Sequence, residues 1–514
     1  MNSWNRPHPL LKIATIVWSK LAIGLWLSNS VFATTPTLII QNPAPQNSST
    51  QNPSVQSELA WNYAYQKNYD ASLELCDRLI QANPDNESFQ LQRATILSWA
   101  NRYRESIQAY QQILTNNPQS IAATIGQAEV LSWDGQYEPA RRLYQQVLTT
   151  DQNHEKALTG MAYLSLWQGD LGHAIDRFTT LRQQFLQSTS IQLGLAKTYI
   201  ARQEIKSARA VLEPLIAAKN ADAIALAKEI NAIQSYTEFT SRNRSSGQNS
   251  LAVNQTVKFR VGDSHTLQSV QVGYSKFNQS GHDVINNTPI RVGIEGINHP
   301  TKWQVNAGVD IFDRLSTQPF VEGNVTTPLN PNLQVGATVN YQAYKENVVT
   351  LENGIKRLQV QPHVYWKITP STSLYAQYGA GFYSDGNRDG QFWAGLKQEL
   401  RNFYVEGSVL SWRYDKDPKN GYFAPSDYFS YAGELGWEGK IADPATCQLA
   451  VTIGRQSYDG QSRPETGYKA GCQVKLSPST SINAQYRHSS SSLLTGEGTS
   501  SNENRVQLNL KTLF

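Results

Sequence analysis

The ten residues KWQVNAGVDI, at positions 302–311, alternate between two kinds of side chain. The apolar set is Trp303, Val305, Ala307, Val309 and Ile311. The polar or small set is Lys302, Gln304, Asn306, Gly308 and Asp310. Because successive side chains of a β-strand point to opposite faces, this period of two predicts a strand with one apolar face and one polar face.

The same alternation recurs at intervals of about 17 residues from Tyr236 to Phe514, which predicts about sixteen strands. Clear examples are residues 333–341 and 468–476. A closed sheet with an apolar outside and a polar inside spans a membrane, and about 16 strands leave a water-filled channel. A soluble β-sandwich is the alternative, but it needs two apolar inner faces and usually has fewer, shorter strands.

The links between the predicted strands alternate in length. The short links are residues 262–264, 299–301, 330–332, 369–371 and 477–479. The longer links are residues 278–287, 346–353, 415–427 and 489–503. Short turns at one rim and long loops at the other are typical of outer-membrane barrels whose two ends lie on the periplasmic, short-turn side. This predicts an outer-membrane protein with an N-terminal periplasmic domain.

The polar faces of the predicted strands carry both signs of charge. The acidic positions are Glu295, Asp310, Glu322, Glu406, Glu434 and Glu438. The basic positions are Lys258, Arg260, Arg291, Lys302, Lys469, Lys475 and Arg487. Such a bore need not strongly favour one ion. Four aromatic residues either face this bore, where flat rings support sugar faces, or belong to the interfacial aromatic girdles: Tyr375, Tyr383, Tyr404 and Trp412.

Before residue 232 the chain follows a different period, of 34 residues. The repeating columns are Tyr69, Tyr103 and Tyr137; Trp99, Trp133 and Trp167; Tyr110, Tyr144 and Phe178; and Ala140, Ala174 and Ala208. This pattern resembles the tetratricopeptide repeat, in about five units over residues 58–231. The resemblance implies stacked helix pairs forming an α-solenoid with a concave partner surface, and the Trp and Tyr columns are interpreted as helix packing. The two periods together predict an α+β multidomain chain, with the transmembrane antiparallel β-barrel at 232–514.

The first 57 residues have two different compositions. Basic residues up to Lys20 precede an apolar run at 21–27, and residues 31–33 fit a cleavage site, so 1–33 is predicted to be a signal peptide. A retained helical anchor is the alternative, but Lys20 cuts the apolar stretch below the ~20 residues that a span needs. Residues 34–57 are rich in Asn, Gln, Pro and Ser and are predicted to form a disordered linker.

Composition excludes several classes of function. A formal net charge of +4 gives no electrostatic reason to expect nucleic acid. The histidines are scattered and show no nucleophile, base or metal-ligand spacing, so no catalytic residue, metal or cofactor is predicted and the chain is not expected to be an enzyme. Cys447 and Cys472 are expected to lie on neighbouring strands but at different heights, because a turn is placed near residues 460–464; free thiols are therefore predicted.

The segment GYFAPSDYFSYAGELGWEGK, from Gly421, resembles a loop and strand of cellulose synthase operon protein C, a tetratricopeptide-repeat exporter of the outer membrane. The matching positions are Gly421, Tyr422, Phe423, Pro425, Tyr428, Phe429 and Trp437. The resemblance implies export of an exopolysaccharide, a cellulose-like glucan first, with the repeats recruiting synthase or periplasmic proteins. It also implies a gate loop that contacts the polymer, and the inward strand faces assigned above supply the lumen residues expected to contact it. The gate residues are Tyr422, Phe423, Pro425 and Tyr428; the lumen residues are Asp310, Glu322, Tyr375, Tyr383, Tyr404, Glu406, Trp412 and Glu434.

The last strand ends in a further motif. Leu508, Leu510 and Phe514 share one face and resemble the recognition signal of the barrel-assembly machinery, although a simple lipid-facing strand end has the same pattern. Two other functions stay open beside export. One is an outer-membrane scaffold in which the barrel only anchors the repeats, and the other is a general solute porin.

Overall fold

The computed structural model describes residues 52–442, 444–458, 460–490 and 502–514. The predicted signal peptide at 1–33 and most of the predicted linker at 34–57 lie outside these residues. The chain divides into two compact units, Met1–Gly135 and Gln136–Phe514, and each is described by itself.

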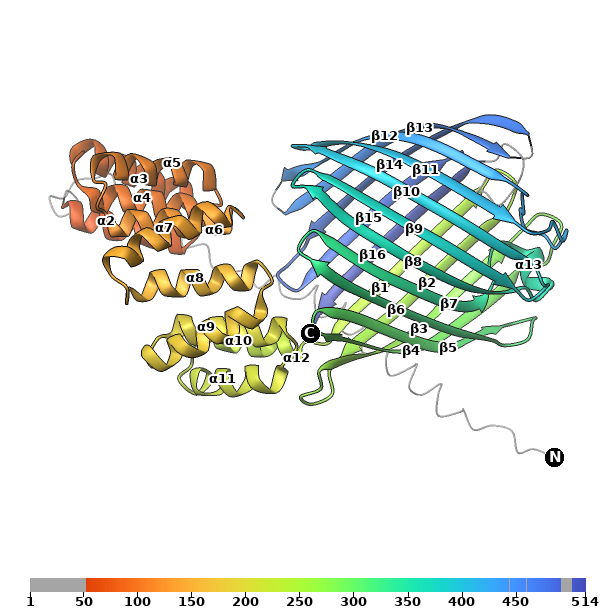
Figure 1. Ribbon diagram of the computed structural model, residues 1–514, viewed down its shortest axis with the longest axis horizontal. Coiled ribbons are helices and arrows are strands. Elements are labelled where there is room, and N and C mark those ends of the chain that lie inside the picture. The colour runs from red at the N-terminus through yellow and green to blue at the C-terminus, as the bar shows by residue number, and fades with distance from the viewer. Residues whose placement is uncertain (1–51, 443, 459, 491–501) are drawn as a thin grey trace, which may run out of the picture. The chain divides into compact units, whose positions relative to one another are not determined.

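Helices come first in the chain, coloured red to yellow in Figure 1. The first unit holds α2 (Pro53–Tyr65), α3 (Tyr69–Ala82), α4 (Glu87–Trp99), α5 (Tyr103–Asn116) and α6 (Ile121–Trp133). The second unit begins with α7 (Tyr137–Thr150), α8 (Glu155–Trp167), α9 (Leu171–Gln184), α10 (Thr189–Ala201), α11 (Ile205–Ala217) and α12 (Ala221–Asn231). None of the described helices is both long enough and apolar enough to cross a membrane.

The helical part begins at Pro53, before the predicted start at Glu58, and this corrects the predicted end of the linker. Asn52 caps the helix, because its side chain accepts a hydrogen bond from Ser54 N at 3.0 Å. Proline at the first helical position has a preset φ and no N–H to leave unpaired. The polar composition of residues 53–57 led to the prediction of disorder where a helix begins.

A glycine column, unnoticed in the sequence, explains how successive repeats pack. A Cβ at Gly160 of α8 would lie 2.3 Å from Cζ of Tyr144 on α7, and one at Gly194 of α10 would lie 2.4 Å from the Phe178 ring of α9. Gly126 meets the ring of Tyr110 in the same way in the first unit. These aromatic rings therefore pack directly on a backbone without side chains, which fixes the helix spacing.

Polar contacts also join successive repeats. At the start of α4, Glu87 accepts hydrogen bonds from Ser120 Oγ at 2.5 Å and Asn117 Nδ2 at 2.7 Å. These donors lower the pKa of the Glu87 carboxyl. Glu155 at the start of α8 accepts a hydrogen bond from Ser188 at 2.5 Å in the same geometry. The first acidic residue of these helices thus binds the residue that caps the next such helix.

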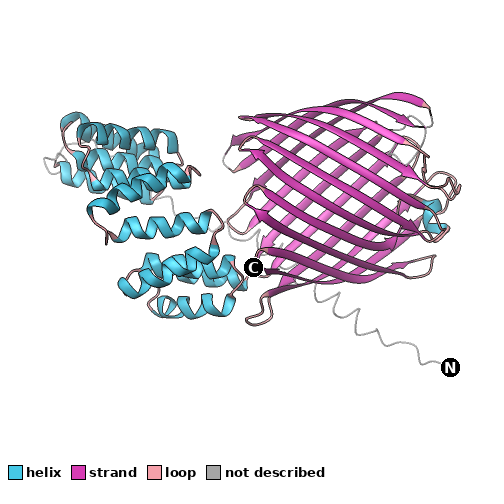
Figure 2. Cartoon of the chain, in the orientation of Figure 1, coloured by secondary structure: helices cyan, strands magenta, loops and turns pink. Residues whose placement is uncertain are grey.

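The rest of the chain forms strands, green to blue in Figure 1 and magenta in Figure 2. They are β1 (Gln234–Arg244), β2 (Asn249–Phe259), β3 (Thr266–Asn278), β4 (Ile285–Asn298), β5 (Thr301–Phe312), β6 (Gln318–Asn330), β7 (Leu333–Ala343), β8 (Lys356–Thr369), β9 (Thr372–Tyr383), β10 (Arg388–Leu400), β11 (Phe403–Tyr414), β12 (Tyr428–Ala442), β13 (Ala445–Tyr458), β14 (Gln461–Lys475), β15 (Thr480–Ser489) and β16 (Glu503–Leu513).

The sixteen strands pair antiparallel in chain order, and β1 closes the barrel by pairing with both β2 and β16. Beside this seam, Phe514 N donates to Ile233 O at 2.9 Å and Ile233 N donates to Phe514 O at 3.2 Å. Closure satisfies the edge groups that an open sheet would expose. The predicted fold class, an α-solenoid followed by a barrel of this size, is confirmed.

The alternation of side chains follows the predicted faces. On β5, Val305 and Ile311 project outward and are 45% and 42% exposed, whereas Asp310 on the other face is completely buried. On β13 the outward residue Ile453 is 70% exposed. An apolar outer surface of this kind requires lipid around it, because water would make its exposure unfavourable.

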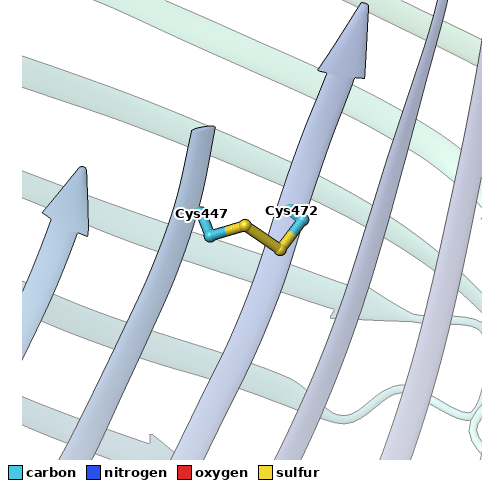
Figure 3. Close-up of a disulfide and its surroundings, with 2 residues drawn as sticks. All are labelled: Cys447 and Cys472. Carbon is cyan, nitrogen blue, oxygen red and sulfur yellow. A yellow bond between two sulfur atoms is a disulfide. The ribbon is translucent and has the colours of Figure 1, made fainter. Parts of the chain in front are cut away.

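The two cysteines of the barrel form a disulfide, so the prediction of free thiols was wrong (Figure 3). Tyr458 pairs with Gln461, which places the end of the hairpin earlier than predicted. With that register Cys447 lies directly opposite Cys472, and their Cα atoms are 4.1 Å apart. The error came from placing the turn too late, because a shift of register moves opposed side chains apart.

Candidate functional site

The inner wall of β1 to β6, together with Lys345 of the segment after β7, lines a polar cavity of about 500 Å³. Its lining includes Tyr236, Lys258, Gln304, Asn306, Phe320 and Glu322. Amide and hydroxyl groups in such a wall exchange hydrogen bonds with water or with a polar solute at little net cost. The barrel interior is therefore polar where the outside is apolar.

Two ion pairs lie on the inner wall between the strand ends. Lys258 contacts Glu295 at 2.6 Å on one side of the barrel. On the other side, Lys469 contacts Glu434 at 2.7 Å. Opposite charges held this close cancel much of each other's field in the bore.

The acidic residues of the predicted lumen, together with Tyr404, fall into three groups. Asp310 lies at the end of β5 and binds Arg291 at 2.6 Å and Lys345 at 2.8 Å. Glu322 accepts hydrogen bonds from two asparagines of the neighbouring strands. Tyr404 donates to Glu434 at 2.7 Å, and Glu406 lies directly opposite Glu434 in the sheet.

One predicted inward charge lies elsewhere. Arg260 follows the end of β2, and its guanidinium donates to Ser264 O and to Gln203 Oε1 at 2.9 Å. It belongs to the β2–β3 turn and not to the bore. The strand ends one residue before it, so the alternation that placed it inward no longer applies.

The four predicted aromatic residues lie on inner-face positions of β9 and β11. Tyr375 lies 5.6 Å from the ring of Trp393, its neighbour on the same face of β10. Tyr383 and Trp412 both lie at the C-terminal ends of their strands, in a buried aromatic cluster with Tyr414. Tyr404 contacts the acidic group described above.

The long link predicted at residues 346–353, for which the sequence indicated no role, belongs to a loop in the mouth of the barrel. Residues 344–355 join β7 to β8 and contain the short helix α13 (Val348–Glu352). Arg244 of β1 binds its Glu346 at 2.7 Å, and Gln279 of the β3–β4 loop accepts a hydrogen bond from Val348 N at 3.1 Å. The loop is thus bound to a strand and to another loop from separate parts of the barrel.

The β11–β12 loop, residues 415–427, meets the β7–β8 loop in the mouth. Asn347 donates to Gly421 O, and Asn353 donates to Asn420 O at 3.3 Å. Gly421 has a φ of +89°, and a Cβ there would lie 2.4 Å from Val349. Only glycine fits both the backbone conformation and the close approach of the two loops.

The predicted gate residues hold this loop to the wall. The Tyr422 ring stacks on Tyr383 at 5.1 Å, and its hydroxyl donates to Asp385 at 2.9 Å. Burial raises the pKa of Tyr422, so this phenol stays protonated and can donate at neutral pH. Phe423 lies edge-on to Tyr428 at 6.5 Å. Pro425 lies beside them and its carbonyl accepts from Tyr414 N at 3.2 Å.

Sequence reasoning missed the β7–β8 loop as the centre of the mouth. The available signal was local: Asn347 and Thr350 form a capping box that starts α13. Its long-range anchor, Arg244, gives no such signal because it precedes its partner Glu346 by 102 residues. Among the described residues, no group of three or more His, Cys, Asp or Glu side chains has the arrangement of a metal site.

Comparison with known proteins addresses both parts of the chain. The tetratricopeptide-repeat family model matches residues 100–164 and 165–229. A bacterial polysaccharide outer membrane secretin aligns over 55% of this chain and 99% of its own, with 13% identity and a TM-score of 0.46. OccAB2 of Acinetobacter baumannii aligns over 55% and 98%, with 10% identity and a TM-score of 0.33.

For the repeats, a thermophilic tetratricopeptide-repeat protein of Thermus thermophilus aligns over 34% of this chain and 97% of its own, with 14% identity and a TM-score of 0.31. Curated proteins gave no match. The repeat model, the closed barrel and its polar interior define the class: tetratricopeptide repeats, which commonly serve protein–protein interaction, joined to a barrel of the outer-membrane type.

Proposed function

We propose that this chain is an outer-membrane channel that exports an exopolysaccharide, with a cellulose-like glucan as the favoured cargo. The observation that carries the proposal is the inner wall itself, where amides, paired charges and flat aromatic rings line a barrel of sixteen strands. Sugars need both hydrogen-bonding groups and apolar rings, because a pyranose has a polar rim and apolar faces.

The chain breaks no bond in this proposal and needs no cofactor. Synthesis of the polymer supplies the driving force, and exchangeable hydrogen bonds let the chain slide without a deep energy minimum. The repeats, placed in the periplasm, recruit the synthase or periplasmic partners. The barrel-assembly machinery inserts the barrel into outer-membrane lipid.

The test compares cells with and without the chain. Polysaccharide is measured in the medium and in the periplasm, and linkage analysis names the sugar. Loss outside with accumulation inside is the expected result. Unchanged amounts in both places would overturn the export function.

A scaffold is the second candidate, and one observation favours it. The β7–β8 and β11–β12 loops bind each other across the mouth, as a barrel that passes nothing large would require. Planar-bilayer conductance separates the candidates. An export channel shows openings of large conductance for a barrel of this size, and a scaffold shows none under any loop substitution.

A further inference from the structure

The inner wall beneath the mouth loops carries an aromatic platform built around a buried ion pair. Its rings are Tyr383 of β9 with Trp412 and Tyr414 of β11, and Trp412 lies 5.1 Å from Tyr414 at an interplanar angle of 29°. Arg357 binds Asp389 at 2.9 Å beside them, and Trp412 Nε1 donates to the same carboxylate at 2.6 Å. We call these five residues the wall platform.

Two tyrosines from the loops cover the wall platform. Tyr422 stacks on Tyr383 with an interplanar angle of 9°, and Tyr344 meets Tyr383 edge-on at 5.3 Å. Tyr414 lies 5.9 Å from Tyr422. Contacts between aromatic rings therefore hold the mouth loops, in addition to the loops' backbone hydrogen bonds.

The wall platform also contains a hydrogen-bond donor that the loops leave unused. Arg357 Nε is buried and has no hydrogen-bond partner among the described residues. A buried polar group without a partner is unfavourable, and a ligand that supplies an acceptor removes that cost. The loops fill the space over the rings but do not satisfy this donor.

Stacked rings beside a charged donor and acceptor are the chemistry that recognises a pyranose. The C–H face of the sugar lies on an aromatic ring, and its hydroxyl groups donate to a carboxylate and accept from a guanidinium. A tyrosine side chain resembles a pyranose in presenting a broad apolar face together with a hydroxyl group that can exchange hydrogen bonds. Tyr422 and Tyr344 thus occupy the places that sugar rings would take.

We propose that the wall platform is a saccharide-binding subsite that the mouth loops occupy in the closed channel. The inference rests on the proposed export function and adds the position at which the cargo acts on the gate. An arriving chain displaces Tyr422 and Tyr344 from the platform, and this releases both loops. The mouth therefore opens where cargo is present and stays closed where it is absent.

The experiment uses the purified full chain and cellohexaose as the probe. Binding is followed by calorimetry, and opening by single-channel recording with cellohexaose added at the short-turn side. Tyr344→Ala with Tyr422→Ala removes the competing rings. If the loops cover the platform in about nine-tenths of the molecules, this variant binds cellohexaose about tenfold more tightly. It also opens without the sugar.

Trp412→Ala, added to the double variant, removes a platform ring and abolishes the gain in affinity. The matched control is Tyr378→Ala, since Tyr378 lies on the outer face of β9 and is 50% exposed. It leaves cellohexaose binding and opening as in the unchanged chain. Heat-modifiable migration on gels verifies that each variant has a folded barrel.

Equal affinity of the unchanged chain and the double variant would overturn the competition. Binding that survives Trp412→Ala would overturn the location of the subsite. The export assay in cells is read separately. Cells that export normally through a chain that binds no cellohexaose overturn the subsite alone, and competition at the platform without export in cells overturns the export function alone.

Discussion

Arg244, the last residue of β1, donates from Nη2 to Glu346 Oε1 at 2.7 Å and from Nε to Glu503 Oε2 at 3.0 Å. Its side chain is only 2% exposed. Glu346 belongs to the β7–β8 loop, and Glu503 begins β16. One buried guanidinium therefore ties the mouth loop to the seam at which the barrel closes.

Arg244→Met is expected to release the β7–β8 loop. Breaking a buried ion pair leaves charge without compensation and costs about 3–5 kcal/mol. The variant should show longer openings in planar bilayers and faster proteolysis within residues 344–355. Arg314→Met is the control, because Arg314 pairs with Asp283 at the surface. Conductance equal to that of the unchanged chain would show that Arg244 does not hold the loop.

Gly160→Ala is expected to destabilise the helical repeats by about 1–3 kcal/mol, because the new Cβ overpacks against a buried ring. That ring belongs to Tyr144, which is 1% exposed. Hydrogen exchange of α7 and α8 in the full chain measures the effect. Gly172→Ala in α9 is the matched control, since nothing lies within 4 Å of a Cβ there. Equal exchange in both variants would contradict the packing described for the glycine column.

Acid is expected to loosen the first unit through Glu87. Its donors lower the pKa of the folded carboxyl below the ordinary value of 4.5, so their stabilisation is present above pH 4.5. It is lost as the pH falls through the lowered folded value. The effect is below about 1 kcal/mol, since water screens this partly exposed group.

Hydrogen exchange of α4 and α6 at pH 6 and pH 3 measures this loss. Glu87→Gln should accelerate exchange at pH 6 and reduce the further change on acidification. The control is Glu74→Gln, which removes an exposed pair with Arg78 instead. A pH response of Glu87→Gln as large as that of the unchanged chain would assign the effect to other groups.

Replacing Cys447 and Cys472 together with serine is expected to destabilise the barrel. The disulfide closes a loop across the β13–β14 hairpin with a sequence separation of 25 residues, and loop closure of that length is worth about 3 kcal/mol. Denaturant titration of the folded band on gels measures the loss. Before reduction, alkylation should label Cys76 only after unfolding, because that thiol is buried. Labelling of Cys447 without reductant would contradict the disulfide.

Phe514 is expected to matter in two separable ways. Deleting it removes the two backbone hydrogen bonds with Ile233 beside the seam, whereas Phe514→Ala keeps them and removes only the ring. If the ring is an assembly signal, both variants lower the amount of folded barrel in membranes. If the strand end only closes the sheet, Phe514→Ala keeps its abundance. Quantitative immunoblotting of outer membranes, with Lys511→Ala as control, measures this.

The alternation at residues 302–311 and the 34-residue columns could be interpreted without a structure because both are local periods. A strand repeats every two residues and a tetratricopeptide unit repeats every 34, so each pattern reports on its own backbone. The same two-residue rule assigned the faces of the strands and placed the side chains of Asp310 and Glu322 inside the barrel. The rule assigned Arg260 to the wrong place, because β2 ends at Phe259, one residue before it.

The prediction for Cys447 and Cys472 depended on where the turn between their two strands was placed. The register of a hairpin follows from its turn, and a late turn separated Cys447 from Cys472. The Gly column at Gly126, Gly160 and Gly194 was readable at the same period of 34 residues. It was missed because glycine contributes no side chain to an apolar pattern.

By itself, then, the sequence determined two repeating architectures, and with them the class of protein. Only the tertiary structure decided which residues meet in the mouth. Arg244 and Glu503 are 259 residues apart, and they touch because closure brings the first and last strands together. Tyr422 meets Tyr383 for a different reason: β9 and β11 end at the same rim, and the loop after β11 packs against the end of β9. Contacts made by closure depend on every intervening strand, and no local period records them.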